Sequence, residues 1–210
     1  MAGMLGVADG SLRNAFCFIG AGGHHAGRSF FGGYCCFNDV AIAVAEVRLL
    51  TPLRRIAIVD TDAHHGDGTR DLVRDDPTIL HVCICGADSV SRDGTKVDVP
   101  FPTPGGSTAD VDGAYLALLD QEVHPRVIGF RPELLVWYFG FDTHRGEYGD
   151  IGLTAHAFLG IADRMQALAD ASCAGRLLVV LGGGSRTDLA TALIPPVIAR
   201  LVGEDSSGGA

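Results

Sequence analysis

The sequence predicts an α/β fold in which helices flank a mainly parallel sheet. Short apolar, β-branched runs alternate with longer segments whose apolar residues recur at helical spacing. The short runs are apolar throughout, which is typical of strands covered by helices on both faces. Motifs rich in Asp, His and Gly directly follow three of these runs. Ligand sites gather at the carboxyl ends of strands in such sheets, so we expect a functional site there.

The individual elements follow from these patterns. Strands are expected over 14–19, 55–59, 79–84, 134–139 and 177–181, and helices over 38–50, 110–127, 154–171 and 187–194. Asn38 and Asp39 are expected to cap their helix rather than contact a substrate. The last helix is expected to stop at Pro195-Pro196, because proline cannot donate a helical hydrogen bond.

The length of 210 residues predicts one domain over residues 1–203, followed by a small, polar and disordered tail at 204–210. The net charge of −9, without any concentration of Lys or Arg, argues against nucleic-acid binding. The absence of an apolar run of membrane-spanning length predicts no membrane insertion. The six cysteines lack zinc-ribbon spacing and lie in apolar contexts, which predicts buried free thiols and a cytoplasmic protein.

The most informative motif is DTDAHHGDG at 60–68, which follows the expected strand at 55–59. Side chains alternate faces along an extended segment, so Asp60, Asp62 and His64 can project to one side. Carboxylates and an imidazole at a buried strand end suit a divalent metal ion. Paired imidazoles occur in GGHHA at 22–26, and a further carboxylate follows a strand in GFDTH at 140–144. Together the three motifs predict a hydrolase site.

These motifs, with GYCCFNDVA at 33–41, resemble in type and order those of the histone deacetylase superfamily. That superfamily includes acetoin-utilisation proteins and acetylpolyamine amidohydrolases. The resemblance implies an arginase-like α/β fold. It also implies an enzyme that hydrolyses an N-acetyl or other N-acyl amine, such as acetyl-lysine or an acetylpolyamine, with water activated by a metal.

The resemblance also implies roles for particular residues. The metal ligands would be Asp62, His64 and Asp142, with Zn²⁺ the default ion and Fe²⁺ also suited to this donor set. The general acid–base pair would be His24 and His25, each oriented by a carboxylate, from Asp60 and Asp67 respectively. The substrate-binding residues would be Gly33 and Tyr34. A structural K⁺ would be bound by Asp60, Asp62 and the His64 carbonyl, with groups near Cys83.

The glycine loop departs from the family pattern, which ends in a tyrosine that stabilises the oxyanion. The chain reads LGGGSR at 181–186, so Ser185 or Arg186 replaces that tyrosine. Removing one oxyanion donor costs about 10²–10³ in rate. Tyr148, in the loop after Asp142, is a third candidate for the missing donor, on position alone.

Two further departures concern the borders of the site. The segment before His24 is short for the family, so the chain is either a minimal version or a fragment. An exposed sheet edge or apolar patch is therefore expected, and homo-oligomerisation would cover it. Residues 86–95 are polar and lack aromatics, which predicts that the mouth of the active site is wide and open to solvent.

The sequence leaves two alternatives to an active deacetylase. A catalytically impaired module that binds acyl-lysine or another carbonyl ligand would explain the replaced tyrosine. A two-metal ureohydrolase needs additional bridging aspartates, and Gly66 stands where one of them would lie.

Overall fold

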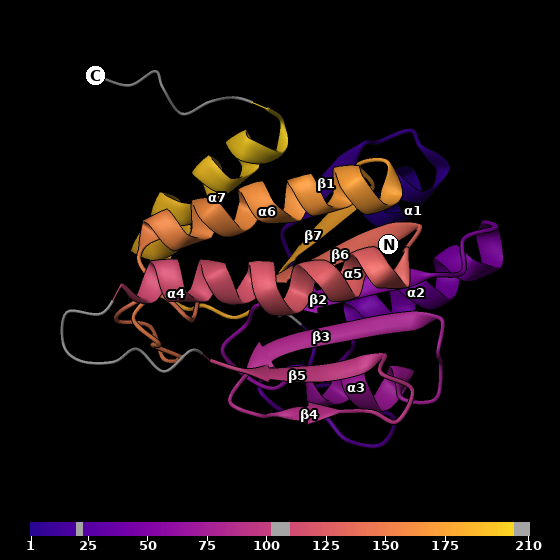
Figure 1. The fold of residues 1–210 in the computed structure, drawn as a ribbon, viewed down its shortest axis with the longest axis horizontal. Coiled ribbons are helices and arrows are strands. Elements are labelled where there is room, and N and C mark those ends of the chain that lie inside the picture. The colour runs from indigo at the N-terminus through magenta and orange to yellow at the C-terminus, as the bar shows by residue number, and fades with distance from the viewer. Residues whose placement is uncertain (20–22, 102–109, 204–210) are drawn as a thin grey trace.

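The computed structural model describes residues 1–19, 23–101 and 110–203 (Figure 1). Its strands are β1 (Asn14–Cys17), β2 (Ile56–Asp60), β3 (Ile79–Cys85), β4 (Ser89–Val90), β5 (Lys96–Pro100), β6 (Leu134–Phe139) and β7 (Leu177–Leu181). They form one sheet in the order β1-β7-β6-β2-β3-β5-β4, in which only β4 runs antiparallel to its neighbour. The predicted α/β fold with a mainly parallel sheet is confirmed.

Helices cover both faces of this sheet (Figure 1). They are α1 (Ala2–Asp9), α2 (Asp39–Leu50), α3 (Asp67–Val73), α4 (Val111–Leu118), α5 (His124–Phe130), α6 (Ala155–Cys173) and α7 (Thr187–Leu201), with a π-helical turn η1 (Leu119–Val123) between α4 and α5. Residues of α4 to α7 form one apolar core with the sheet, and residues of α1 to α3 form the second. The central strands are buried on both sides, which explains their uninterrupted apolar sequence.

Asn38 caps its helix as expected, whereas Asp39 is the first residue of that helix and Thr154 caps another. The Asn38 side chain accepts from the Ala41 amide at the start of α2. The Thr154 hydroxyl accepts from the His156 amide at the start of α6. Each cap satisfies a backbone donor that has no partner within its own helix.

One helix end was predicted wrongly. Helix α7 continues through Pro195-Pro196 to Leu201, instead of stopping at the first proline. Pro195 is exposed, so water can reach the backbone carbonyls that the prolines leave without donors. Leu193, Val197 and Leu201 are buried against the core, and this packing outweighs the lost hydrogen bonds.

The remaining differences are short or polar elements. Strand β1 ends at Cys17, earlier than expected, and the predicted helix over 110–127 is the run α4–η1–α5. Helices α1 and α3 and strands β4 and β5 were not anticipated. Strand β5 carries buried Lys96 and Asp98, which made it resemble a loop. The Lys96 ammonium is satisfied by the carbonyls of Asp76 and Ile79, at 3.0 and 2.8 Å.

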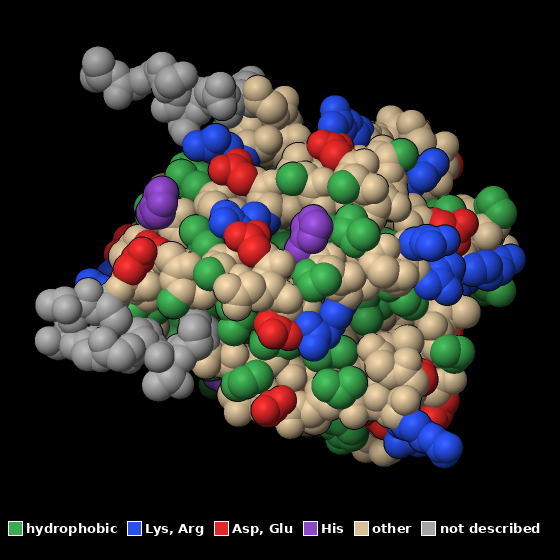
Figure 2. Space-filling view, viewed as in Figure 1, with side chains coloured by type: hydrophobic (Ala, Val, Ile, Leu, Met, Phe, Trp, Pro, Cys, Tyr) green, Lys and Arg blue, Asp and Glu red, His purple; other side chains and the backbone are tan. Residues whose placement is uncertain are grey.

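Acidic and basic side chains are interspersed on the helical face shown in Figure 2. One example is the Arg164 guanidinium, which pairs with Asp120 at 2.8 Å. Among the described helices, none is long and apolar enough to cross a membrane. The predicted tail at 204–210 lies outside the described residues.

Several aromatic side chains among the described residues between 18 and 37 are exposed. Phe18, Phe31, Tyr34 and Phe37 are each more than two-thirds exposed. This agrees with the expectation of an apolar patch, while homo-oligomerisation stays a prediction.

Candidate active site

Three loops meet where neighbouring strands end. Strand β2 leads into residues 61–66, β6 into 140–150 and β7 into 182–186. Because β7, β6 and β2 are neighbours and parallel, their carboxyl ends lie at one edge of the sheet. The structure therefore brings together the motifs that lie far apart in the sequence.

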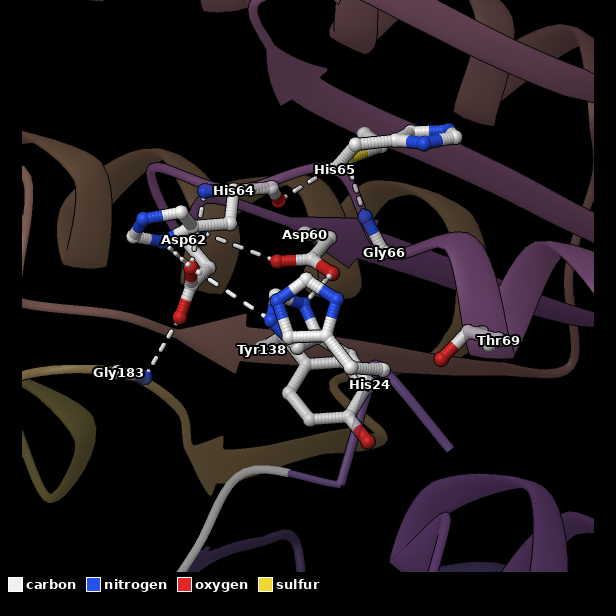
Figure 3. Close-up of polar contacts among 12 residues, drawn as sticks. His24, Asp60, Asp62, His64, His65, Gly66, Thr69, Tyr138 and Gly183 are labelled. Carbon is white, nitrogen blue, oxygen red and sulfur yellow. Dashed lines mark hydrogen bonds and ion pairs between the residues drawn. The ribbon is translucent and has the colours of Figure 1, made fainter. Parts of the chain in front are cut away.

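The three residues expected to bind a metal lie together at this edge. Figure 3 labels two of them, Asp62 and His64. Potential ligand atoms of Asp62, His64 and Asp142 are all within 4.8 Å of one another. His64 Nδ1 is 3.1 Å from Asp62 Oδ1 and 2.9 Å from Asp142 Oδ2. Backbone amides orient both carboxylates: Gly183 donates to Asp62 Oδ2 at 2.6 Å, and Ala63 donates to Asp142 Oδ1 at 3.1 Å.

The electrostatics of this group fit a divalent cation. Burial and the negative charge of Asp62 raise the pKa of Asp142 to about 8. Asp142 Oδ2 is buried, and it forms no well-oriented hydrogen bond within the described part of the chain. The donor set is two buried carboxylates and an imidazole, and one carboxylate oxygen, Asp142 Oδ2, lacks a well-oriented hydrogen bond from any residue that the structure describes. A divalent ion would neutralise both carboxylates and satisfy that oxygen.

His24 is held beside the same group by Asp60 (Figure 3). Its Nδ1 lies 2.8 Å from Asp60 Oδ2, and its Nε2 lies 3.6 Å from Asp62 Oδ1. Burial opposes protonation of this imidazole. The charge and hydrogen bond of Asp60 outweigh that effect and raise the pKa of His24 to about 10. The two side chains thus form a buried pair in which Asp60 favours the protonated form of the imidazole.

His25 forms the second histidine–carboxylate pair. Its Nδ1 lies 2.6 Å from Asp67 Oδ1, and its ring centroid is 4.2 Å from that of His24 and 6.1 Å from that of His64. Gly33 packs against this imidazole, and a Cβ there would approach His25 Cδ2 to 2.2 Å. Gly33 also has φ +51°, so the position requires glycine both sterically and conformationally.

These side chains line a cavity of about 420 Å³. Its walls come from the histidine segment, the β2 and β6 loops and the glycine loop: His24, His25, Gly33, Tyr34, Cys35, Asp62, His64, Tyr148, Gly182, Gly183, Gly184 and Ser185. Tyr34 is 98 % exposed, so the mouth is open on that side. Among the described residues, none of 86–95 lines the cavity, and the wide mouth expected from the sequence stays a prediction.

Ser185 and Arg186, either of which replaces the family's glycine-loop tyrosine, both bond to neighbouring carboxylates. The Ser185 hydroxyl donates to Glu147 Oε2 at 3.1 Å, and the Ser185 amide donates to Glu147 Oε1 at 2.8 Å. The Arg186 guanidinium pairs with the Asp188 carboxylate at 2.6 Å. Both side chains therefore anchor the start of α7.

Tyr148 supplies a hydroxyl in the cavity from the β6 loop. Its Oη accepts a hydrogen bond from the Gly184 amide at 2.9 Å, and its ring centroid lies 5.5 Å from that of His64. A Cβ on Gly183 would lie 2.7 Å from this Oη and 2.5 Å from Asp62 Oδ2, so hydroxyl and carboxylate flank the same glycine. Burial raises the pKa of Tyr148 to about 12, so the hydroxyl keeps its proton at neutral pH.

Glu147 was not anticipated from the sequence. It is 7 % exposed, and its carboxylate accepts from the amides of Tyr148, Ser185 and Arg186. It thereby ties the β6 loop to the first turn of α7. The only signal in the sequence is an acidic residue near a tyrosine, and the helix that it caps begins about 40 residues later, beyond the reach of local patterns.

Replacing Glu147 with alanine is expected to lower the free energy of unfolding by about 1–3 kcal/mol, because several partly buried amide and hydroxyl donors lose their acceptor. Urea denaturation measures this. Glu122→Ala is the matched control, since it removes an exposed partner of Arg126 and should cost less than about 1 kcal/mol. Equal stability of the two variants would contradict the anchoring role of Glu147.

The monovalent-cation site stays a prediction. The His64 carbonyl, one of its expected ligands, lies 3.8 Å from Cys83 Sγ, which donates to it. This contact confirms that Cys83 lies against the loop that carries His64.

Comparisons with known proteins agree with the fold and identify the family. The profile of the histone deacetylase domain matches residues 1–200. The human polyamine deacetylase HDAC10 is 32 % identical over 216 residues, covering 94 % of this chain and 31 % of the relative. A probable deacetylase of Archaeoglobus fulgidus is 32 % identical over 193 residues, covering 85 % of this chain and 52 % of the relative. The crystal structure of the HDA15 HD domain has a TM-score of 0.83 at 28 % identity, covering 97 % of this chain and 61 % of that one.

The fold and the site define an α/β protein with an Asp–His–Asp group and two histidine–carboxylate pairs at the carboxyl edge of its sheet. The chain belongs to the histone deacetylase family. It spans between about a third and about half of the length of the two curated relatives described above.

Proposed function

We propose that this chain is a metal-dependent amidohydrolase that cleaves the amide of an N-acetyl or other N-acyl amine. The observation that carries the proposal is the cavity that His24, His25, Asp62 and His64 line together. Asp60 and Asp67 contact the two histidines, and Asp142 lies within 4.8 Å of Asp62 and His64. Asp62, His64 and Asp142 would hold the ion, with Zn²⁺ the default. Such an ion lowers the pKa of a water molecule and polarises a carbonyl group.

His25 is the general base and acid of the proposed reaction. Asp67 engages Nδ1, which leaves Nε2 as the ring nitrogen for the substrate side. His25 takes a proton from the attacking water and later gives one to the leaving amine, while Asp67 stabilises the imidazolium formed between these steps. His24, already positively charged through Asp60, favours the negative charge that develops on the substrate oxygen.

Tyr148 is the proposed oxyanion donor. Its Oη accepts the Gly184 amide hydrogen, so its own proton is available for a substrate oxygen. Its raised pKa keeps that proton in place at neutral pH. A phenol entering from the β6 loop would then replace the tyrosine that the glycine loop lacks.

The substrate class follows from the cavity and from the relatives. The curated relatives are named as deacetylases, one of them as a polyamine deacetylase. Acetylated lysine peptides and small acetylated polyamines are the proposed substrates, and the open mouth beside Tyr34 favours no narrow selection between them. A cytoplasmic location remains part of the proposal.

The test is turnover of acetyl-lysine and trifluoroacetyl-lysine peptides by the zinc-loaded protein, with His25→Ala for comparison. The trifluoromethyl group activates the carbonyl, so that peptide depends less on an oxyanion donor. We expect hydrolysis of both peptides and a loss of about 10²–10⁴-fold in His25→Ala.

Hydrolysis of the activated peptide alone would mean that Tyr148 does not serve as the donor. No hydrolysis of either peptide by folded, zinc-loaded protein would overturn the enzymatic proposal. It would favour a module that binds a carbonyl ligand without turnover, as the engagement of Ser185 by Glu147 also permits.

A further inference from the structure

A second group of ligand-type side chains is buried under the α3 face of the sheet. Cys83 and Cys85 alternate with apolar residues on β3, and Asp98 lies on the neighbouring β5, paired in register with Cys83. Register partners and residues two apart on a strand share one face, so the three side chains converge. Their sulfur and carboxylate atoms lie within 4.8 Å of one another, and none of the three residues is more than 3 % exposed.

A fourth donor, His65, lies beside Asp98, outside the group whose atoms are all within 4.8 Å of one another. His65 Nε2 lies 3.2 Å from Asp98 Oδ1. Both atoms are buried, and neither makes a well-oriented hydrogen bond to any described residue. Buried polar atoms that have only ion-pair contacts, without a well-oriented hydrogen bond, are uncommon. The geometry thus leaves an imidazole nitrogen and a carboxylate oxygen aimed at the same small space.

Two further side chains, from Ser89 and Arg70, contact the Asp98 carboxylate. Ser89 Oγ donates to Asp98 Oδ2 at 2.6 Å, and Arg70 Nη1 lies 3.1 Å from Asp98 Oδ1. Ligating carboxylates are commonly oriented by such outer partners. Arg70 also balances charge, because two thiolates and a carboxylate exceed the charge of a divalent ion by one.

We propose that Cys83, Cys85, Asp98 and His65 form a second metal site, for a thiophilic divalent ion of the zinc class. Two sulfurs, an imidazole nitrogen and a carboxylate oxygen make a four-coordinate set that suits Zn²⁺. Ligand atoms around tetrahedral zinc lie roughly 3.5 Å apart. Cys83, Cys85 and Asp98 already lie within 4.8 Å of one another, and rotation of the His65 side chain would have to bring its imidazole to the same ion.

The proposed site lies directly under the catalytic loop. Cys83 Sγ is 3.8 Å from the His64 carbonyl and accepts from the Gly66 amide at 3.4 Å. An ion held by Cys83 and His65 would tie β3 to the segment that carries His64. The role is structural: the ion fixes the loop that presents the Asp62, His64 and Asp142 group.

Cobalt(II) distinguishes the two sites by spectroscopy. Only a site with thiolate ligands gives a sulfur-to-cobalt charge-transfer band in the near ultraviolet, and the Asp62, His64 and Asp142 group contains no sulfur. The experiment is anaerobic titration of the metal-free full chain with Co²⁺, in a reductant that lacks thiols. We expect two equivalents to bind, with a charge-transfer band that Zn²⁺ removes.

Cys85→Ser should lose this band and one equivalent of Co²⁺, and should keep the other equivalent, which also shows that it is folded. Cys36→Ser is the matched control, because Cys36 is an exposed free thiol, and it should keep both equivalents and the band. Absence of the band in the wild-type chain would overturn the proposal. A band that survives in Cys85→Ser, or disappears in Cys36→Ser, would overturn it as well.

Discussion

Asp142→Asn is expected to abolish stoichiometric metal binding at the catalytic group and to lower turnover of an acetylated peptide at least about 10³-fold. The substitution keeps the volume of the side chain but removes one of the two buried carboxylate charges. The remaining pair, Asp62 and His64, then offers one charge instead of two to a divalent ion. Metal content after dialysis and kcat measured with saturating zinc together test this expectation.

A surface aspartate provides the control for this change. Asp163 is exposed and lies 3.7 Å from Arg200, so Asp163→Asn makes the same chemical change without touching the cavity. It should keep full metal content and turnover. If Asp142→Asn also kept its metal and its activity, the assignment of Asp142 as a ligand would be wrong.

Tyr148→Phe is expected to lower kcat about 10²–10³-fold and to leave KM nearly unchanged. The phenol donates only as charge develops on the substrate oxygen, so its loss affects the transition state more than the bound ground state. The trifluoroacetyl peptide should lose less than the acetyl peptide, because its carbonyl needs less stabilisation. Steady-state kinetics on both peptides measures the difference.

Two comparisons separate this effect from a general loss of structure. Tyr115 is fully buried in α4, and its hydroxyl has no hydrogen-bond partner among the described residues, so Tyr115→Phe should leave kcat unchanged. Ser185→Ala should cost less than about tenfold, since its hydroxyl donates to Glu147. A larger loss in Ser185→Ala than in Tyr148→Phe would assign the oxyanion role to Ser185.

Much of the fold was predictable because it depends on strongly patterned segments. The runs that became β2, β6 and β7 are apolar throughout, and buried parallel strands require that pattern. Helix α7 was predicted only in part, because burial of Leu193 and Val197 outweighs the two prolines. Strand β5 was missed because Lys96 and Asp98 find partners in other elements, which no local pattern reveals.

The candidate site was likewise predictable only in part. The residues grouped at the cavity, such as His25 and Asp62, belong to motifs that follow strands, so the carboxyl edge of the sheet brings them together. The orientation of Tyr148 could not be obtained from the sequence. It depends on the Gly184 amide and on the anchor formed by Glu147, across a long separation in the chain. The second group at Cys83 and Asp98 likewise depends on the register of β3 and β5.

The position of β1 in the sheet has a consequence for how the site assembles. Strand β1 pairs only with β7, although the two lie near opposite ends of the described chain. During synthesis, β2, β3, β5 and β6 can pair before β7 leaves the ribosome, whereas β1 must wait for it. Strand β1 thus precedes the other strands along the chain and joins the sheet after them. Contacts of such long sequence separation form slowly, whereas His24 and His25 contact Asp60 and Asp67, which do not depend on β7, so the histidine–carboxylate pairs can form before β1 completes the edge of the sheet.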